Sequence, residues 1–400
     1  MITVPECQSR VLSQITQATP PEVIPVKKSL GRVLAVEIRA PFDVPPSDNS
    51  AVDGYAIGSR DLPREGVVEL RVVGELPAGS LFERVVQRGE AVRIMTGAPL
   101  PKGVDSVVPQ EEVERRSDHV LIPVIAAHAN VRYRGEDVRE GTLVLEAGSP
   151  IRPQEMGLLS SLGIAQLSVR QKPRVAILST GDEVAEPGTS RSPGQIYDSN
   201  RFTLLGLVEG MSCEAIDFGI IPDARERLKE TLTKAADRAD VLLTSGGVSV
   251  GSYDLVKDVL AEVGRIDIWQ IAMQPGRPMA HGRIGRAHFF GLPGNPVASM
   301  LTFLLFVRPA LWKLLGRKDL APRRFTAFAT EALTKKKGRQ EFKRGILTFN
   351  NDRWEVKTTG PQGSGILTSM VLGNCFIVLD EDRGDVNAGE TVLVEPFQLT

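Results

Sequence analysis

The chain has 400 residues, 42% of them hydrophobic and 24% charged, which is enough for roughly two to four packed domains. Its 48 basic and 49 acidic residues leave a formal net charge of -1, so no global positive field would attract DNA or RNA, and we expect no nucleic-acid partner. Cys7, Cys213 and Cys375 lie far apart in the sequence, which argues against a disulfide framework or a zinc knuckle and fits a reducing cytoplasm.

The N-terminal segment does not have the layout of a secretion signal. Residues 1–10 are polar and contain Pro5 and Glu6, whereas a signal peptide places a basic segment before an apolar one. The spacing of Val4 and Val11 instead predicts a short amphipathic helix. The most apolar stretch of the chain, 297–315, is interrupted by arginine and proline, so we interpret it as a core helix and expect no membrane association.

The first part of the chain has the pattern of a β-rich module placed inside another domain. Between about residues 42 and 139, short apolar segments alternate with turns rich in Gly, Pro and Asp, which is typical of a small β domain. The run 151–164 looks helical. We expect residues 1–41 and 140–169 to pack together as one N-terminal domain, with the β module inserted between them.

From residue 170 to about 321 the pattern changes to alternating strands and helices. Asp223 and Glu226 have capping-box spacing, which supports the start of a helix there. This alternation predicts an α/β domain with a parallel sheet. The expected strands are Val175–Leu178, Ala215–Ile221, Val241–Leu243 and His288–Leu292, and the expected helices are 200–210, 223–238, 254–263 and about 297–315.

The last part of the chain, 322–400, returns to strands. Two strand-like runs flank the turn Asn350-Asn351-Asp352, and two more follow at 375–379 and 391–395. We expect a C-terminal β-barrel. The predicted fold is therefore a central α/β domain with an inserted β-rich domain and a C-terminal barrel.

A glycine-rich turn after the strand at 241–243 is the most distinctive motif of the α/β domain. The run Ser245-Gly246-Gly247-Val248-Ser249 is followed by Asp254. Paired glycines let the backbone approach a ligand closely, and successive N–H groups can bind an oxyanion. The run matches neither the P-loop nor the dinucleotide-binding pattern. A tight structural turn is the alternative interpretation.

Two further strands of the same domain end in similar turns. Thr180-Gly181-Asp182-Glu183 follows the first strand, and Pro293-Gly294-Asn295-Pro296 follows the last. Asn295 suits a helix N-cap and Pro296 the first helical position, so the amides of the next helix should point above the sheet. Because ligands bind at the carboxyl ends of parallel strands, the three turns predict a site for a phosphate-bearing ligand. Glu183 and Asp254 are the expected ligands of Mg²⁺ or a similar divalent cation.

Taken in order, these motifs resemble the molybdopterin molybdenumtransferases, the family of bacterial MoeA and of the E domain of gephyrin. The resemblance covers essentially the whole chain. It implies four domains and a homodimer, with a cleft formed by the α/β and C-terminal domains of one chain and the inserted domain of the other. The motifs that carry it are Asp48–Ala56, Ile94–Pro99, Arg134–Asp137, Ser179–Glu183, Tyr197–Asn200, Ser245–Gly251 and Gly291–Pro296.

The resemblance also implies a reaction and a set of site residues. Adenylylated molybdopterin and molybdate, the co-substrate, would give molybdenum cofactor and AMP with the help of Mg²⁺, and a molybdate oxygen would be the nucleophile. The catalytic positions would be Asp53, Glu183, Asp223 and Asp254. Together with the turn residues, the substrate-binding positions would be Thr96, Asp137, Thr180, Gly181, Ser245, Gly246, Gly247, Ser249, Arg277, Pro293, Gly294, Asn295, Pro296, Arg344 and Ser364.

Some of these positions also have a structural interpretation. Asp53 precedes a glycine and could be only a turn aspartate, and Asp137 could belong to a surface ion pair with Arg132 or Arg134. The run Lys335-Lys336-Lys337 is interpreted as a solvated hairpin face, whereas Arg339 and Arg344 are better placed to reach phosphate.

The chain departs from the family at one segment. Many relatives have lysines where this chain has Gln270 and Gln274. An amide donates hydrogen bonds but carries no charge, and a compensating Arg277 is not equivalent to a lysine. The preference between molybdate and tungstate therefore stays open.

Two other functions remain open at this stage. One is a different reaction on the same α/β module, either the adenylylation of molybdopterin or a nucleotide hydrolysis as in competence-damage-like proteins. The other is a non-enzymatic scaffold. The expected macromolecular partners are the molybdopterin adenylyltransferase and the acceptor molybdoenzymes. The four histidines show no metal-ligand spacing and are assigned no catalytic role.

Overall fold

The computed structural model describes residues 1–246 and 253–397, with the side chains of 253–257 left outside the description. The chain forms two compact units. Unit 1 contains residues 1–36, 147–153 and 166–400, and unit 2 contains residues 37–146 and 154–165. The α/β sheet and the C-terminal strands belong to unit 1, and the β-rich module belongs to unit 2.

The central sheet of unit 1 has six strands in the order β16-β13-β17-β21-β20-β18. The first four are parallel, as predicted, and comprise β16 (Glu214–Ile221), β13 (Arg174–Thr180), β17 (Val241–Ser245) and β21 (Ala287–Leu292). The sheet is nevertheless mixed. β20 (Pro278–Ile284) is antiparallel to β21, and β18 (Gly264–Gln270) is antiparallel to β20. The tight connection between β20 and β21, in which Ile284 pairs with Ala287, permits only an antiparallel neighbour.

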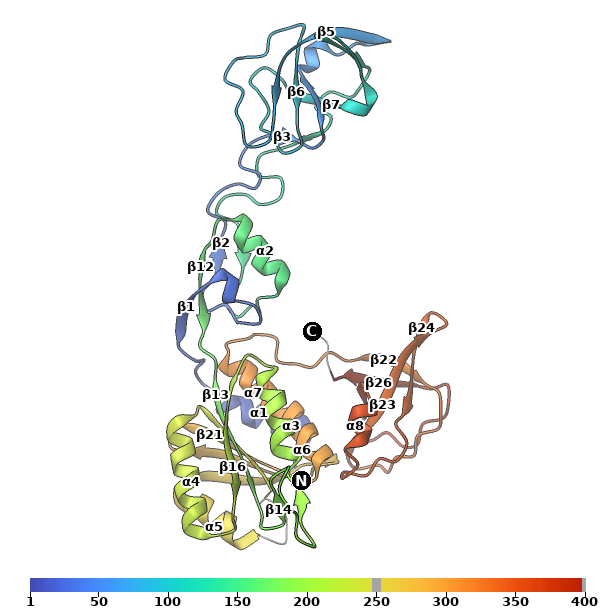
Figure 1. Ribbon diagram of the computed structural model, residues 1–400. Coiled ribbons are helices and arrows are strands. Elements are labelled where there is room, and N and C mark those ends of the chain that lie inside the picture. Colours follow the sequence, from blue (N-terminus) through green and yellow to red (C-terminus); the bar gives the residue numbers. More distant parts are fainter. Residues whose placement is uncertain (247–252, 398–400) are drawn as a thin grey trace. The chain divides into compact units, whose positions relative to one another are not determined.

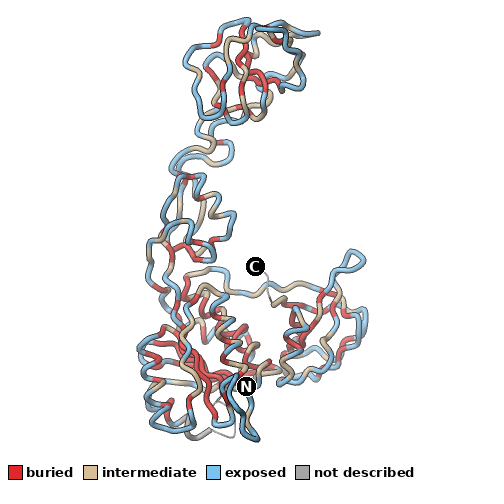
Figure 2. The backbone as a smooth tube through the Cα atoms, in the orientation of Figure 1, coloured by how far each residue is buried: buried red, intermediate tan, exposed pale blue. Residues whose placement is uncertain are grey.

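Helices cover both faces of this sheet (Figure 1). One face packs against α4 (Arg225–Arg238) and α5 (Tyr253–Val263). The other packs against α1 (Val4–Ser13), α3 (Asn200–Glu209) and the long helix that follows β21. The strands between the two helical layers form the most continuous buried region of the chain (Figure 2). Burial of both faces explains why their sequences are apolar runs without alternation.

The predicted core helix has an irregular centre. It consists of α6 (Pro296–Thr302), a π-helical turn η4 (Phe303–Val307) and α7 (Arg308–Leu314). Pro309 has no N–H to continue the α-helical ladder, and the N–H of Arg308 reaches five residues back to Phe303 O. In the described part of the chain, only Pro296–Leu314 is long and apolar enough to cross a membrane, and 78% of it is buried within the fold, as expected of a core helix.

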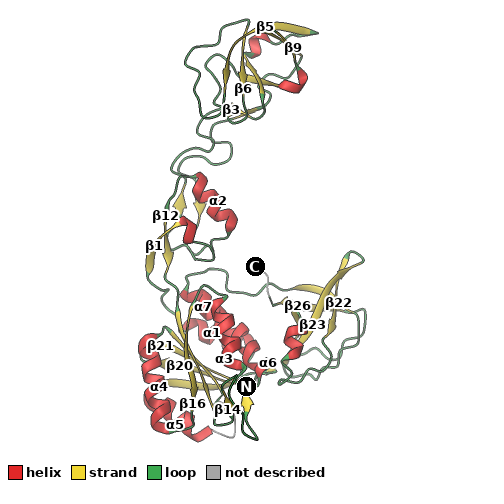
Figure 3. Cartoon of the chain, viewed as in Figure 1, coloured by secondary structure: helices red, strands yellow, loops and turns green. Residues whose placement is uncertain are grey.

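The C-terminal strands close into the predicted barrel (Figure 3). The ring runs β23-β24-β22-β26-β25 and closes again on β23. The predicted hairpin is present, and Asn351 and Asp352 at its tip have φ values of 48° and 58°, as a type I′ turn requires. The strands are β22 (Phe325–Ala329), β23 (Gln340–Asn350), β24 (Arg353–Thr358), β25 (Cys375–Leu379) and β26 (Thr391–Pro396), with β19 (Met273–Gln274) added beside β23 and α8 (Thr368–Leu372) before β25.

Unit 2 contains the predicted β-rich module. Its sheet has the order β7-β4-β6-β5-β9-β8. The strands are β4 (Gly54–Ile57), β5 (Val67–Leu76), β6 (Glu90–Ile94), β7 (Ser106–Pro109), β8 (Glu114–Arg116) and β9 (His119–Pro123), and the short pair β3 (Asn49–Ser50) and β10 (Val131–Arg132) lies outside this sheet.

The segments that flank this module pair with each other. β1 (Pro21–Pro25) pairs with β12 (Gln166–Arg170) within unit 1, and β2 (Ile38–Arg39) pairs with β11 (Leu143–Leu145) within unit 2. The predicted helix at 151–164 is α2 (Pro153–Ser161). The chain therefore enters and leaves the β-rich module on neighbouring antiparallel strands, which is the arrangement that an inserted module needs.

Candidate functional site

The three glycine-containing turns of the α/β domain converge, as predicted. β13, β17 and β21 end in register at the same edge of the sheet. The N–H of Gly246 donates to Leu292 O at 3.2 Å. Gly246 has a φ of +90°, and a Cβ there would lie 3.0 Å from Thr180 O. A Cβ on Gly294 would lie 4.0 Å from Gly246 Cα. Glycine at 246 therefore lets the turns after all three strands approach one another.

Asn200 connects two of these turns and was assigned no role in the sequence analysis. It is the first residue of α3, and its Nδ2 donates to Ser245 Oγ and to Gly294 O, both at 2.7 Å. In the described part of the chain, its Oδ1 and the Oγ1 of Thr180 are buried without a hydrogen-bond partner. Buried polar atoms are normally satisfied, so these two oxygens can bind a ligand that donates hydrogen bonds. The Tyr197–Asn200 motif before a helix was the available signal.

Carboxylates gather at the ends of β13 and β16. A Cβ on Gly181, whose φ is +125°, would lie 2.5 Å from Glu183 Oε2, so the Glu183 carboxylate lies directly over this glycine. The N–H of Asp223 donates to Asp182 Oδ1 at 3.2 Å. Partial burial, followed by the nearby charges of Asp182 and Glu183, raises the pKa of Asp223 above its usual value. Asp182 was absent from the predicted site.

The prediction that Asp223 belongs to a capping box is wrong. α4 begins at Arg225, its N-cap is Ala224, and no side chain caps it. The N–H of Leu228 bonds to Ala224 O, so the helix starts two residues after Asp223. This leaves Asp223 beside Asp182, at the edge of the sheet.

The carboxylate cluster suits a divalent cation that is shared with a phosphate ligand. No group of three His, Cys, Asp or Glu residues within the described residues forms a complete metal site. Mg²⁺, however, uses only one or two protein carboxylates and takes its other oxygens from phosphate and water. The mutual repulsion that raises the pKa of Asp223 is the kind that a cation relieves. Asp254 lies in the first turn of α5, but its side chain, like Gly247 and Ser249, lies outside the described residues.

The turn after β21 binds the C-terminal barrel. Pro296 starts α6 and Asn295 is its N-cap, as predicted, although the Asn295 side chain makes no capping bond. The N–H of Val297 donates to Ser364 O at 3.1 Å. The amide of Val297 is therefore occupied by the barrel loop and is not free to bind a ligand. The same bond brings Ser364 to the turn that contains buried Pro293.

Arg344 supplies a buried positive charge close to this loop. Only 1% of its surface is exposed. Its Nε donates to Ser369 Oγ at 2.9 Å and its Nη2 to Gly363 O at 3.0 Å, so both recorded partners of the guanidinium are neutral. Burial lowers the pKa of Arg344. A buried arginine without a carboxylate partner is suited to receive an anion.

The predictions for the other basic residues are mixed. Lys336 and Lys337 are exposed, as expected, but Lys335 is only 5% exposed, so the solvated interpretation is wrong for it. Its Nζ donates to Arg383 O at 2.9 Å and satisfies a carbonyl of the barrel. Arg339 donates to Gln274 Oε1 at 3.4 Å. The amide at 274 therefore contacts the guanidinium, while Gln270 and Arg277 are exposed.

Three predicted site residues lie in unit 2, which is described by itself. Asp53 Oδ1 accepts hydrogen bonds from Thr96 N–H at 2.7 Å and Thr96 Oγ1 at 2.6 Å, and these bonds lower the pKa of Asp53. Both residues are exposed. Asp137 lines a hollow of about 390 Å³ with residues 135–139, 142–144 and Leu158. Arg134 pairs with Asp43 rather than with Asp137.

Comparison with known proteins identifies the family. Residues 2–163 match the MoeA N-terminal region (domains I and II), residues 176–313 match a probable molybdopterin binding domain, and residues 326–397 match the MoeA C-terminal region (domain IV). The chain is 42% identical to the molybdopterin molybdenumtransferase of Haemophilus influenzae over 99% of both chains. The chain belongs to the molybdopterin molybdenumtransferase family. It is a transferase of molybdenum cofactor biosynthesis.

Further similarities agree with this assignment. The transferase is 35% identical to molybdopterin molybdenumtransferase 2 of Mycobacterium tuberculosis, over 96% of this chain and 97% of the relative. Its fold matches the molybdopterin biosynthesis moeA protein of Pyrococcus horikoshii with a TM-score of 0.87 and 32% identity, covering 99% of this chain and 100% of that one. The full-length matches include the β-rich and barrel regions, which favours metal transfer over the other reactions considered for the α/β module.

Proposed function

We propose that this transferase inserts molybdate into adenylylated molybdopterin and releases AMP, in a reaction that depends on Mg²⁺ or a similar divalent cation. The observation that carries the proposal is the convergence of the Thr180, Gly246 and Gly294 turns beside the carboxylates Asp182, Glu183 and Asp223. Glycine turns bring backbone N–H groups close to phosphate oxygens, and the neighbouring carboxylates suit the cation that accompanies a pyrophosphate.

The residues of the site divide into groups with different tasks. Asn200 fixes the spacing between the turns after β17 and β21, and its unpaired Oδ1 can accept a hydrogen bond from the pterin or ribose part of the substrate. Arg344, whose side chain donates hydrogen bonds to Ser369 Oγ and Gly363 O, can hold an anionic group of the substrate near Ser364. The bound cation would be held by Glu183 and Asp254 and would neutralise charge on the phosphates as AMP leaves.

The nucleophile in this proposal is an oxygen of molybdate, which is a substrate. The protein therefore needs no activated serine or cysteine. Burial agrees with this, because it raises the pKa of each of the three cysteine thiols to about 12, which keeps them protonated and unreactive.

We also propose that the transferase works in the cytoplasm as a homodimer, and that unit 2 contributes Asp53, Thr96 and Asp137 to the substrate cleft of the partner subunit. The family resemblance supports this part of the proposal. The molybdopterin adenylyltransferase and acceptor molybdoenzymes are the proposed macromolecular partners.

The decisive experiment mixes the purified transferase with adenylylated molybdopterin, Mg²⁺ and either molybdate or tungstate, and measures AMP release. We expect release that depends on molybdate and falls by about 100-fold or more in Glu183→Gln, because charge neutralisation by a bound cation contributes several kcal/mol. Glu214→Gln is the matched control, since Glu214 is exposed at the other end of β16.

Each outcome of this experiment separates the proposals. Release at the wild-type rate in Glu183→Gln would remove the carboxylate cluster from the mechanism. AMP release with tungstate but not with molybdate would indicate a changed oxyanion preference, which we would assign to Gln270 and Gln274. Absence of release with either oxyanion would overturn the proposed reaction.

A further inference from the structure

A pocket of about 440 Å³ lies at the end of the central sheet opposite the strand-end turns. It is lined by Gln14, Arg265, Ile266, Asp267, Gly282 and Arg283. Arg283 pairs in register with His288, whereas β21 ends at Leu292, about 13 Å further along the strand. The pocket is therefore separate from the candidate active site.

Two arginines of the pocket have no acidic partner among the residues that the structure describes. Arg265 and Arg283 are directly opposite each other on β18 and β20, an arrangement that like charges destabilise. Within the described residues, neither guanidinium contacts a carboxylate. Arg283 donates instead to the carbonyl of Gln14 at 3.2 Å and to that of Arg286 at 3.4 Å. An anion between the two side chains would remove this repulsion.

The position of Arg283 is fixed from behind by His288. Nη2 of Arg283 lies 3.1 Å from His288 Nε2. Burial lowers the pKa of His288 to about 4, so the imidazole is neutral near pH 7 and Nε2 can accept a hydrogen bond from the guanidinium. The bond to the carbonyl of Gln14, at the C-terminal end of α1, holds the same side chain from the other side. A guanidinium that is oriented before binding loses less entropy when it captures an oxyanion.

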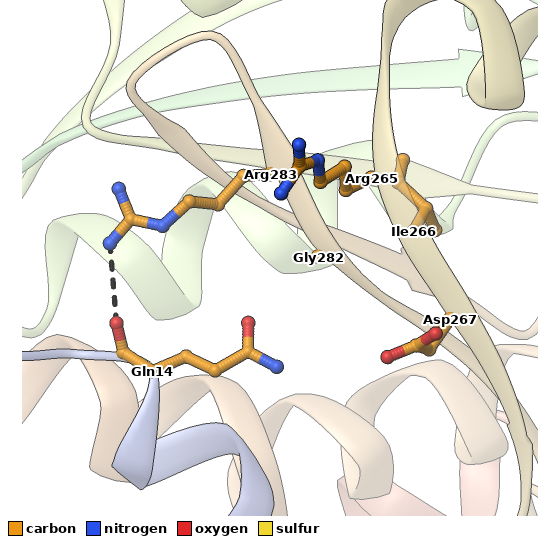
Figure 4. A pocket seen from close by; sticks show the side chains of 6 residues that line it. All are labelled: Gln14, Arg265, Ile266, Asp267, Gly282 and Arg283. Carbon is orange, nitrogen blue, oxygen red and sulfur yellow. Dashed lines mark hydrogen bonds between the residues drawn. The ribbon is translucent and has the colours of Figure 1, made fainter.

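The pocket also contains a carboxylate, Asp267, and the side-chain amide of Gln14, which can bind the uncharged part of a ligand. Asp267 lies two residues after Arg265 on β18, so both side chains point to the same face of the sheet. Figure 4 shows the Asp267 carboxylate and the Gln14 side-chain amide facing each other across the pocket, with Arg283 extended over the end of α1. A carboxylate that is not paired with either arginine is an acceptor for a hydroxyl or amine.

We propose that this pocket binds a small phosphate ester with free hydroxyl groups, of the sugar-phosphate kind. Arg265 and Arg283 bind the phosphate, and Asp267 accepts a hydrogen bond from a hydroxyl. The planar guanidinium of Arg265 matches a phosphate group, which accepts bidentate hydrogen bonds. Arg283, whose Nη2 already donates to Gln14 O and to His288 Nε2, adds its charge and a single hydrogen bond. Arg265, Asp267 and Arg283 are exposed, so the pocket is open to solvent, and its volume of about 440 Å³ exceeds what inorganic phosphate alone would fill.

The test maps arginine reactivity in the full-length protein. Phenylglyoxal modifies accessible guanidiniums, and peptide mass spectrometry gives the rate at each residue. We expect ribose 5-phosphate to slow the modification of Arg265 at least fivefold. Arg286 is the matched internal control, because it is exposed on the β20–β21 hairpin and does not line the pocket. Equal rates at Arg265 with and without millimolar ribose 5-phosphate would overturn the proposal.

Two variants test the role of each group. Asp267→Asn should raise the ribose 5-phosphate concentration needed for half-maximal protection of Arg265 about tenfold and leave that of inorganic phosphate unchanged. If the two probes protect equally in both proteins, the pocket is a general oxyanion site and the sugar-phosphate assignment is wrong. Arg265→Gln should retain molybdate-dependent AMP release, so failure of this inference and failure of the proposed function are separable.

Discussion

Two charge clusters near β13 and β16 differ in whether they contain both signs of charge. Arg201 is 2% exposed and forms ion pairs with Asp198, Asp217 and Glu186. In the neighbouring cluster of Asp182, Glu183 and Asp223, a backbone N–H is the hydrogen-bond donor found among the described residues, and burial followed by the charges of Asp182 and Glu183 raises the pKa of Asp223. The first cluster is complete within the protein and stabilises it, whereas the second is incomplete and suits a cationic ligand.

The C-terminal barrel shows the same contrast between a buried charge with ion-pair partners and one without them in the described residues, but here the group without them is a cation. Glu395 is 2% exposed and binds both Arg308 and Arg324, which joins β26 to the core helix. Arg344, equally buried, donates its side-chain hydrogen bonds to neutral groups within the described residues. In both regions, a buried charge that pairs with an opposite charge marks a structural contact, and one without such a pair in the described residues marks a candidate binding position.

The largest effect on stability should follow from breaking the ion pairs of Arg201. Arg201→Met removes the cation that pairs with buried Asp198, and an unpaired buried carboxylate costs about 3–5 kcal/mol. Urea unfolding followed by circular dichroism measures the loss. Arg10→Gln is the control, because the Arg10–Glu6 pair is about half exposed and should contribute less than about 1 kcal/mol. A loss of similar size in both variants would refute the distinction between the clusters.

A medium effect is expected at Gly246, in the turn after β17, the strand that lies between β13 and β21. Gly246→Ala should destabilise the protein by about 1–3 kcal/mol, because alanine is strained at a φ of +90° and its Cβ would lie 3.0 Å from Thr180 O. Gly294→Ala is the control, since its Cβ meets nothing closer than 4.0 Å and no positive φ is recorded there. AMP release and thermal unfolding of both variants give the comparison. Equal behaviour of the two variants would mean that the close approach at Gly246 has no energetic role.

The smallest effect should have the opposite sign. Asp223→Asn removes one negative charge from the cluster with Asp182 and Glu183. It should stabilise the protein at pH 7, by less than about 1 kcal/mol because the group is largely solvated. The folded pKa lies above the usual 3.8, so the folded state binds more protons than the unfolded state. Stability from this group is complete below pH 3.8 and is lost as pH rises through the raised pKa. The gain from the substitution should therefore grow between pH 4 and pH 7.

Thermal unfolding of wild type and Asp223→Asn across this pH range checks the sign. Magnesium should reduce the difference, since a bound cation removes the repulsion in the wild type. A variant that is less stable than wild type at pH 7 without magnesium would show that Asp223 has a favourable partner.

Local sequence patterns determined most of the secondary structure and the position of the candidate site. Apolar runs marked β13, β16, β17 and β21, and helical periodicity marked α3 and α4, because burial of a strand or helix face leaves a repeat of fixed period. Glycine, proline and asparagine marked the strand-end turns, because only a few residue types accept their backbone angles. The ordered motifs were sufficient to indicate the family.

Contacts between distant segments were decided only by the tertiary structure. The bond from Val297 to Ser364, the approach of Asp182 to Asp223 and the burial of Lys335 each depend on segments brought together by folding. The antiparallel edge strands, which place Arg265 opposite Arg283, also escaped prediction. A sequence records the preferences of each residue for its neighbours along the chain and for burial. Which charges meet, and which stay without a partner, depends on long-range packing that no local period encodes.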